Sequence, residues 1–586
     1  MARRGLLRTP APGPERPRAR GPVRPADWPP PFSPDEVIAS PTDPPDERID
    51  VGVLIVGAGP AGLACAIRLG QLLEERPDVA ERLGEVPVAV LEKGKQPGSH
   101  LLSGAVVNPR ALQRLFRGRK RIDELPFAGR VDHESVYFLT RSRALRIPTP
   151  PTMRNHGNFV ASLAELGRWL ADEAETAGAT ILPETAAHRL LVEGARVVGV
   201  RTADRGRGRD GSPLGNFEPG SDILARATVL AEGTLGHLTQ AALHRFGLAG
   251  DNPQVWALGV KEVWRVAKPL DRVIHTMGWP LRGSPAFREF GGSFVYPHGD
   301  DLVSLGLVVG LDYRDAELSV HDLLQELKTH PLIRRVLQGG ERLEWGAKTI
   351  PEGGFLSLPQ RLHAPGFVIA GDAAGLVNVP ALKGIHYAIE SGRLAAEAVF
   401  EALKPGTTAW TPGALAGYDR ALQTSFVWSD LQRVRNMRQA FGRGFWMGGA
   451  LAGMMTVSRG MLPPGNARTE RDSDPELMRT DRARRYPRPD GTLTFDKLSS
   501  VFASGNKTRD DQPSHIRVRR RVPIRLAEMW VRMCPAQVYE LGEGHGDGTV
   551  DVQVTPSNCV QCGAITAKGG RLTMPEGGSG PEYTRT

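Results

Sequence analysis

A glycine-rich turn follows a short apolar run near the start of the chain. Val51–Val56 reads VGVLIV, and Gly57, Gly59 and Gly62 follow it in the segment GAGPAGLACAIRL. The first glycine permits a tight turn, the second lets the backbone approach a pyrophosphate, and the third lets a helix pack close to a strand. A phosphate would then lie at the positive end of the helix dipole. This spacing predicts a dinucleotide-binding site.

Two carboxylates could complete such a site. Glu92 directly follows the apolar run VAVL. A carboxylate at this position accepts hydrogen bonds from ribose hydroxyls. The interval between Gly57 and Glu92 is longer than the roughly 20 residues typical of the motif. Far along the chain, Gly371 and Asp372 follow the strand-like PGFVIA and precede a helical pattern. This second element could bind a ribityl hydroxyl and the flavin phosphate. The glycine turn and the Gly371–Asp372 turn together resemble the two-part FAD site of glutathione-reductase-like flavoproteins. A site for NAD alone would not need the second turn.

Three of the four cysteines, Cys534, Cys559 and Cys562, lie in the last tenth of the chain. Four cysteines in 586 residues are too few for a disulfide scaffold. Their clustering therefore suggests a metal centre in a reducing compartment. The remaining Cys65 lies in the helix predicted after the glycine turn, where a small core residue is expected.

Composition and length indicate what kind of protein must position these residues. At 40% hydrophobic and 24% charged residues, the chain is globular, and its length predicts three or four domains. The formal net charge is +9, but the first thirty residues carry seven arginines against Glu15 and Asp27. The rest is only mildly basic, so no nucleic-acid partner is expected. The Pro-rich tail, residues 1–48, is expected to be a disordered extension.

No stretch reaches the ~20 apolar residues that a membrane-spanning helix needs. The nearest candidate, Gly444–Ser458, reads GFWMGGALAGMMTVS, is uncharged and is bracketed by Arg443 and Arg459. Its length is typical of a buried core helix or of an interfacial element, and the sequence does not separate the two.

From about Ile49 to the C-terminus, the chain resembles the electron transfer flavoprotein–ubiquinone oxidoreductase family. Segments that match in order include LEKGKQPGSHLLSGAVVNP, HTMGWPL, FGGSFVYP, GDAAGLVNVPALKGIHYAIESG and PEGGSGPEY. The resemblance implies an α/β and α+β fold, in which a glutathione-reductase-like FAD-binding fold is interleaved with a quinone- and membrane-facing domain. A ferredoxin-like iron–sulfur domain would follow at the C-terminus.

The implied domains run in sequence order. The expected ranges are a disordered tail (1–48), a first FAD-binding part (49–240) with a membrane-facing element near 101–115, a ubiquinone-binding domain (241–355), a second FAD-binding part (356–430), a membrane-proximal segment (431–480) and an iron–sulfur domain (481–586).

The resemblance also implies individual site residues. The FAD-binding positions are Gly57, Gly59, Pro60, Ala61, Gly62, Glu92, Lys93, Gly371 and Asp372. Gly291 and Gly292 match the pair whose backbone binds the quinone oxygen. A quinone carbonyl needs an amide donor in an apolar pocket, and glycine permits close approach.

The cysteine segment departs from the family pattern. The family holds a [4Fe–4S] cluster with one cysteine in a CPAxVYE segment and three in a CxxCxxC run. In this chain MCPAQVYE supplies Cys534, and NCVQC supplies Cys559 and Cys562. The last position of the run is Ile565 instead of cysteine. Three thiolates cannot complete a four-cysteine site. A [3Fe–4S] cluster, a [4Fe–4S] cluster with a water, hydroxyl or carboxylate ligand, a zinc site that includes His545, and no metal all remain open.

The implied function is that of an electron-transferring-flavoprotein dehydrogenase of the respiratory chain. It would pass electrons from reduced electron transfer flavoprotein through FAD, and an iron–sulfur cluster if present, to ubiquinone or menaquinone. The expected location is the cytoplasmic face of a bacterial inner membrane, bound peripherally, or the matrix side of the mitochondrial inner membrane. An NAD(P)H-dependent FAD reductase or hydroxylase and a non-catalytic FAD-binding subunit are the alternatives. No general acid or base is expected, and His100 and His386 are predicted to be structural.

Overall fold

The glycine turn follows a central strand of a mixed sheet. The computed structural model describes residues 21–42, 48–299, 301–462, 465–478 and 484–586. In its first sheet, β2 (Arg48–Val56) pairs in parallel with β14 (Asp222–Leu230) and β3 (Val88–Leu91). Both faces of these strands are covered, so they read as continuous apolar runs. The remaining strands of this sheet are β1 (Ile38–Ala39), β9 (Thr180–Leu182), β10 (Ala187–Glu193), β11 (Arg196–Thr202), β20 (His363–Ala364) and β21 (Phe367–Ile369).

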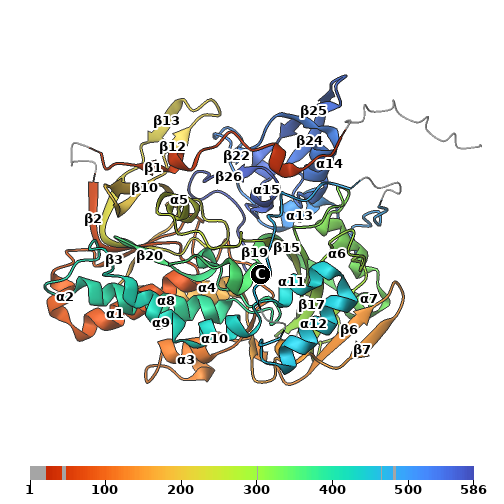
Figure 1. The fold of residues 1–586 in the computed structure, drawn as a ribbon, viewed down its shortest axis with the longest axis horizontal. Coiled ribbons are helices and arrows are strands. Elements are labelled where there is room, and N and C mark those ends of the chain that lie inside the picture. Colours follow the sequence, from red (N-terminus) through yellow and green to blue (C-terminus); the bar gives the residue numbers. More distant parts are fainter. Residues whose placement is uncertain (1–20, 43–47, 300, 463–464, 479–483) are drawn as a thin grey trace, which may run out of the picture.

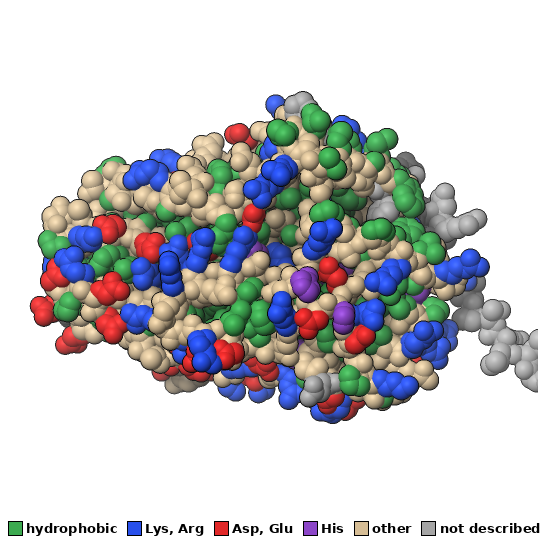
Figure 2. All heavy atoms as spheres, turned by 90° about the horizontal axis from the view of Figure 1, so that it is seen from below, with side chains coloured by type: hydrophobic (Ala, Val, Ile, Leu, Met, Phe, Trp, Pro, Cys, Tyr) green, Lys and Arg blue, Asp and Glu red, His purple; other side chains and the backbone are tan. Residues whose placement is uncertain are grey.

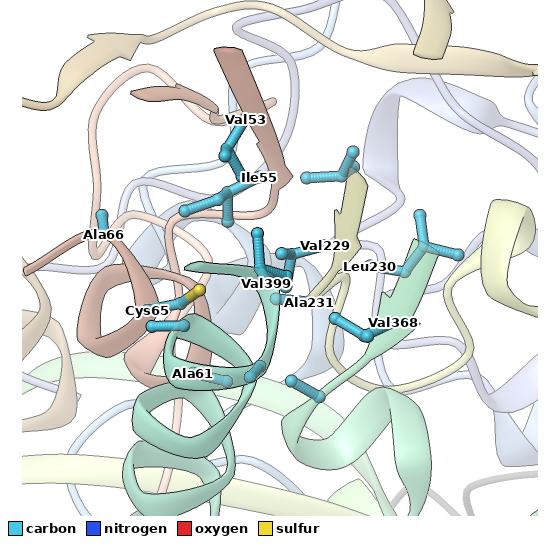
Figure 3. Packing of buried hydrophobic residues seen from close by; sticks show 14 of the residues in the cluster. Val53, Ile55, Ala61, Cys65, Ala66, Val229, Leu230, Ala231, Val368 and Val399 are labelled. Atoms are coloured by element: carbon cyan, nitrogen blue, oxygen red, sulfur yellow. The ribbon is translucent and has the colours of Figure 1, made fainter. Parts of the chain in front are cut away.

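Helices α1 (Pro60–Glu75) and α8 (Ile385–Leu403) pack together against this sheet (Figure 1). A Cβ on Gly392 would lie 2.0 Å from the carbonyl oxygen of Ala61, so the two helices approach backbone to backbone. Figure 3 shows Cys65 of α1 among apolar side chains of β2, β14, β21 and α8. Its thiol is fully buried, which confirms the prediction of a core residue.

A second, seven-stranded sheet lies beside the first (Figure 1). Neighbouring strands are antiparallel except for the parallel pair of β16 and β6. In order across the sheet, the strands are β19 (Glu341–Pro351), β15 (Trp256–Arg265), β18 (Leu302–Gly310), β17 (Gly291–His298), β16 (Val273–Gly278), β6 (Glu134–Leu139) and β7 (Ala144–Ile147).

The C-terminal domain carries the three clustered cysteines. Its three-stranded sheet, in the order β23 (Arg521–Pro523), β25 (Thr549–Val554) and β24 (Tyr539–Gly544), packs against helix α14 (Ile524–Met533). The short helix α15 (Ala564–Ala567) follows the cysteine pair. Figure 1 shows this domain, in blue, over one end of the second sheet.

One of the domain expectations is wrong within the described residues. Residues 21–42 are folded, because β1 pairs with β10, Val23 is buried and Arg519 donates to the Pro29 carbonyl oxygen at 3.0 Å. Residues 1–20 and 43–47 of the predicted tail lie outside the described residues.

The membrane-facing role of the segment 101–115 stays a prediction. Its Ala111, Leu112 and Leu115 are buried beside the first sheet, whereas Leu101 and Leu102 are half-buried and line a cavity. The apolar segment after Gly444 forms helix α12 (Phe445–Val457) at the surface.

No described helix is long and apolar enough to cross a membrane.

A buried ion pair joins the second sheet to the helix that covers it. The carboxylate of Glu262 on β15 accepts hydrogen bonds from Lys328 of α6 (Val320–Lys328) at 2.8 and 2.9 Å and from the Trp264 indole at 2.7 Å. Both members of the pair are fully buried. Replacing Glu262 by Gln leaves the lysine charge buried without its anion, which typically costs about 3–5 kcal/mol. We expect Glu262→Gln to lower the free energy of unfolding by this amount, as measured by urea denaturation.

The exposed pair of Arg265 and Glu341 at the edge of the same sheet supplies the control. Their side chains are 50% and 69% exposed, and such surface pairs contribute about 0–1 kcal/mol. The variant Glu341→Gln should therefore unfold close to wild type. Equal denaturation midpoints for the two variants would contradict the role assigned to the buried pair.

Candidate functional site

A cavity of about 970 Å³ lies between the two sheets and the cysteine loop. Segments that are far apart in the sequence meet there. Among its lining residues are Gly57, Gly59, Pro60, Ala61, Glu92, Lys93, Gly291, Gly292, Asp372, Gln561 and Gly563. The structure thus brings both quinone positions and all the predicted FAD positions except Gly62 and Gly371 to one cavity, together with the loop that holds Cys559 and Cys562.

The glycine turn has the geometry of a phosphate cradle. Gly57 has a φ of +107°, and a Cβ on it would lie 2.4 Å from the carbonyl oxygen of Ala231. A Cβ on Gly62 would lie 2.0 Å from the Gly57 carbonyl oxygen, whereas at Gly59 the nearest atom would be Leu101 Cδ2, at 3.8 Å. Packing therefore requires glycine at the first and third positions, and the second leaves the N-terminus of α1 open to an anion.

Glu92, which directly follows β3, binds the backbone of the same turn through its carboxylate. Its Oε1 accepts from the Gly94 N–H at 2.6 Å, and its Oε2 from the Ala58 N–H at 3.3 Å. Burial raises the pKa of this carboxyl group, against the opposing effect of the Gly94 hydrogen bond. Lys93 also lines the cavity, but its Nζ donates to Gln561 Oε1 at 2.6 Å. The ammonium group of Lys93 is therefore bound to the cysteine loop.

The second FAD element lies directly against the first. Gly371 has a φ of +69° and donates its N–H to Ser391 Oγ at 2.9 Å, and a Cβ on it would lie 2.8 Å from the Ala61 Cβ. Burial raises the pKa of the adjacent Asp372 to about 6. The carboxyl group thus faces the cavity next to the start of α1, as the two-part FAD site requires.

The glycine pair predicted to bind quinone begins β17. A Cβ on Gly292 would lie 2.7 Å from the Thr276 carbonyl oxygen and would otherwise meet only the Thr276 carbonyl carbon, at 3.9 Å. Both glycines line the cavity, and because they have no side chain, it is their backbone that faces it. On the neighbouring strand, His275 Nε2 hydrogen-bonds the Tyr296 hydroxyl at 2.7 Å. Burial lowers the pKa of His275 to about 3, so this ring is neutral at pH 7.

The sequence analysis did not identify three cavity residues. His275 and Tyr296 lie in HTMGWPL and FGGSFVYP, which entered only as family segments. Glu232 accepts hydrogen bonds from the N–H and Oγ1 of Thr239, each at 2.6 Å, at the start of α5 (His237–Arg245). A lone glutamate within LAEGTLGHLT carries no spacing signal, so only the fold reveals it.

The three clustered cysteines lie close enough to influence one another. Cys534 ends α14, and Cys559 and Cys562 lie in the loop before α15. The N–H of Val538 donates to Cys534 Sγ at 3.5 Å, and that of Gln561 donates to Cys559 Sγ at 3.4 Å. Burial, and then the neighbouring Cys534 thiol, raise the pKa of Cys562 to about 12.

The zinc alternative does not fit this geometry. His545 Nε2 lies 3.1 Å from an oxygen of the Asp551 carboxylate on the β24–β25 hairpin. In the part of the chain that the structure describes, no group of three histidine, cysteine, aspartate or glutamate side chains could hold a single metal ion. The residues likewise do not fit a four-cysteine cluster, because Ile565 stands at the fourth position and is buried.

Comparisons with known proteins agree with this arrangement. Residues 256–350 match the family model for the ETF-QO ubiquinone-binding domain, and residues 491–584 match that for the electron transfer flavoprotein-ubiquinone oxidoreductase 4Fe-4S domain. A geranylgeranyl bacteriochlorophyll reductase-like protein from Thermoplasma acidophilum shares the fold, with a TM-score of 0.53 and 18% identity over 71% of this chain and 92% of that one.

Curated relatives span nearly the whole chain. The mitochondrial electron transfer flavoprotein-ubiquinone oxidoreductase of Arabidopsis thaliana is 40% identical over 92% of this chain and 85% of its own length. The enzymes of the same name from Bos taurus and Pseudomonas aeruginosa are 38% and 36% identical, over 91% and 92% of this chain and 89% and 99% of their own lengths. The chain therefore belongs to the electron transfer flavoprotein-ubiquinone oxidoreductase family.

Proposed function

We propose that this protein accepts electrons from reduced electron transfer flavoprotein and delivers them to ubiquinone or menaquinone. Its cofactors are FAD and an iron–sulfur cluster. The observation that carries the proposal is the shared cavity, in which the glycine turn, Gly291–Gly292 and the cysteine loop all take part. FAD supplies both one-electron and two-electron redox chemistry, and the protein fixes its position.

Each part of the cavity has a binding role. The N-terminus of α1 holds the FAD pyrophosphate, Glu92 accepts from the ribose hydroxyls, and Asp372 accepts from a ribityl hydroxyl. The N–H groups at Gly291 and Gly292 bind a quinone carbonyl oxygen. The tight packing that Gly57 and Gly62 impose keeps α1 against β2, so the pyrophosphate site is formed before FAD binds.

The same cavity reaches the exposed helix α12. Gly449, Ala452 and Thr456 of this helix line the cavity, while Trp446 and Met447 are 76% and 57% exposed. On the face in Figure 2, hydrophobic side chains gather in the right half of the view, the half in which Figure 1 places α12. An apolar surface beside the cavity would let a membrane quinone enter without crossing water.

We propose, therefore, a peripheral location on a membrane surface. The relatives from Arabidopsis thaliana and Caenorhabditis elegans are named as mitochondrial. For this chain, the cytoplasmic face of a bacterial inner membrane, or the matrix side of a mitochondrial one, gives access to both electron transfer flavoprotein and the quinone pool.

A turnover assay tests the proposed function. The purified protein is mixed with chemically reduced electron transfer flavoprotein and a short-chain quinone analogue, and partner oxidation and quinol formation are followed. We expect both to proceed at rates that depend on the protein. Failure to oxidise the partner, together with rapid flavin bleaching by NADPH alone, would instead identify a reductase or hydroxylase. Flavin binding without either reaction would identify a non-catalytic subunit.

The membrane surface yields a separate prediction. Burying one large apolar side chain contributes about 1.5–3 kcal/mol, so the double variant Trp446→Ser, Met447→Ser should bind anionic phospholipid vesicles at least tenfold more weakly. Vesicle co-sedimentation measures this. Phe502→Ser is the matched control, because Phe502 is 89% exposed but lies on α13 (Lys497–Ala503), away from α12 in Figure 1. Equal losses in the two proteins would refute membrane binding through α12.

A further inference from the structure

We propose that Cys534, Cys559 and Cys562 hold a three-iron [3Fe–4S] cluster in place of the four-iron cluster of the matched family domain. The inference rests on the proposed function only in that the centre is built from iron and sulfide. The number of irons follows from the buried apolar side chain of Ile565 at the position of the fourth ligand.

Three lysines, Lys93, Lys348 and Lys497, each bond a segment that carries one of the cysteines. Lys93 donates to Gln561 Oε1 at 2.6 Å and Lys348 to the Gln561 carbonyl oxygen at 3.2 Å. Both contacts lie between Cys559 and Cys562, so two cations stand at the cysteine loop.

None of these three lysines forms an ion pair with a carboxylate within the described ranges of the chain. Lys497 instead donates to the carbonyl oxygens of Val531 and Arg532, at 2.9 and 3.1 Å, just before Cys534. Cations withdrawn from water need an anion nearby. The carboxylates of Glu92, near Lys93 and Lys348, and of Asp322, near Lys497, supply part of that negative charge, and thiolates that bind iron would add to it.

Among the described residues, the three thiols do not form a site for a single metal ion. A single zinc ion holds its sulfur ligands at about 2.3 Å, so the thiols must converge on one point. No such convergence of three ligands occurs among the described residues. In an iron–sulfur cluster each thiolate binds a different iron, and the ligands stand further apart. The observed N–H donors to Cys534 and Cys559 are a common second feature of such sites.

The fourth corner is closed by an apolar side chain. Ile565 is 5% exposed and shares a core cluster with Cys534, Cys559 and Val518. A Cβ on Gly570 would lie 2.5 Å from Ile565 Cγ1 and 2.8 Å from Val518 Cγ1, so these side chains fill the space there. A fourth iron would face hydrocarbon and lack a ligand, whereas a [3Fe–4S] cluster needs only the three thiolates present.

Two threonine hydroxyl groups beside the cysteine loop are already engaged. Thr349 Oγ1 donates to the Cys562 carbonyl oxygen at 2.8 Å, and Thr566 Oγ1 accepts from the Leu572 N–H at 2.9 Å. The phenol of Tyr539 is buried near all three thiols, and it belongs to the family segment MCPAQVYE rather than to the altered run. Tyr539 therefore stands where the family already has it and does not replace the missing cysteine.

Iron and sulfide content and low-temperature EPR test the inference on the full chain, purified anaerobically with FAD bound. We expect about three irons and four sulfides per FAD, and an EPR signal in the oxidised protein that one-electron reduction removes. Ile565→Cys should raise the content to about four irons and give a signal that appears only on reduction. Ile565→Val and Tyr539→Phe should both keep three irons.

Each contrary result has a distinct meaning. Four irons in the anaerobic wild-type protein, or a signal that appears only on reduction, would overturn the inference, as would the absence of iron. Loss of one iron in Tyr539→Phe from a four-iron wild type would identify the phenol as the fourth ligand. If Ile565→Cys fails to fold, the wild-type content still decides. Cluster content is measured without turnover, so a protein with three irons that fails to reduce quinone would count only against the proposed function.

Discussion

The variant Gly62→Val is expected to be purified without flavin. A Cβ at this position would lie 2.0 Å from the Gly57 carbonyl oxygen and 3.0 Å from Ile55 Cγ2. The first of these atoms belongs to the backbone and cannot rotate away, so valine would push α1 off β2 and displace the N-terminus that lines the cavity. We expect FAD affinity to fall by more than about 100-fold, or roughly 2.7 kcal/mol.

Flavin absorbance relative to protein, and calorimetric titration of the apoprotein with FAD, measure this loss. Gly129→Val is the control, because no atom lies within 4 Å of a Cβ built at Gly129 and its φ is compatible with any residue. That variant should retain its flavin. If Gly62→Val also retained full flavin content, the close contact between the glycine turn and α1 would not position the FAD site.

The FAD part of the site could be predicted from local sequence. A tight turn requires glycine at Gly57 and close helix packing requires it at Gly62, and Asp372 lies just after a strand, so both elements carry a pattern that is visible in one dimension. Their meeting in space could not be derived from periodicity, and came from the family resemblance. The contact between Gly371 and Ala61 now gives it a physical basis.

Other features depend on tertiary contacts that leave no local pattern. Lys93 follows Glu92 directly, yet its ammonium group bonds Gln561 from the other end of the chain. In the segment 101–115, Ala111, Leu112 and Leu115 are buried beside the first sheet, and composition alone does not separate burial in a core from burial in a membrane. Residues 21–42 were predicted to be disordered from their proline content, but edge pairing with β10 orders them.

The second large effect is expected at the quinone site. In Gly292→Leu, the new Cβ would lie 2.7 Å from the Thr276 carbonyl oxygen on β16, so the two strands must shift, and the rest of the side chain has room on the side where Gly292 lines the cavity. It would occupy the space from which a quinone carbonyl reaches the backbone N–H groups. We expect quinone reduction to fall by more than about 100-fold, which corresponds to roughly 2.7 kcal/mol, while FAD content stays at the wild-type level.

Separate half-reactions, followed by stopped-flow absorbance, locate the defect. Reduced electron transfer flavoprotein should still reduce the bound flavin of Gly292→Leu, because the substitution lies on β17 and not on α1, β3 or the turn at Asp372. Reoxidation by the quinone analogue should be lost. Gly215→Leu, placed where no atom lies within 4 Å of a built Cβ, controls for the added bulk. Loss of both half-reactions would mean that Gly292 supports the flavin, and retention of both would place quinone elsewhere in the cavity.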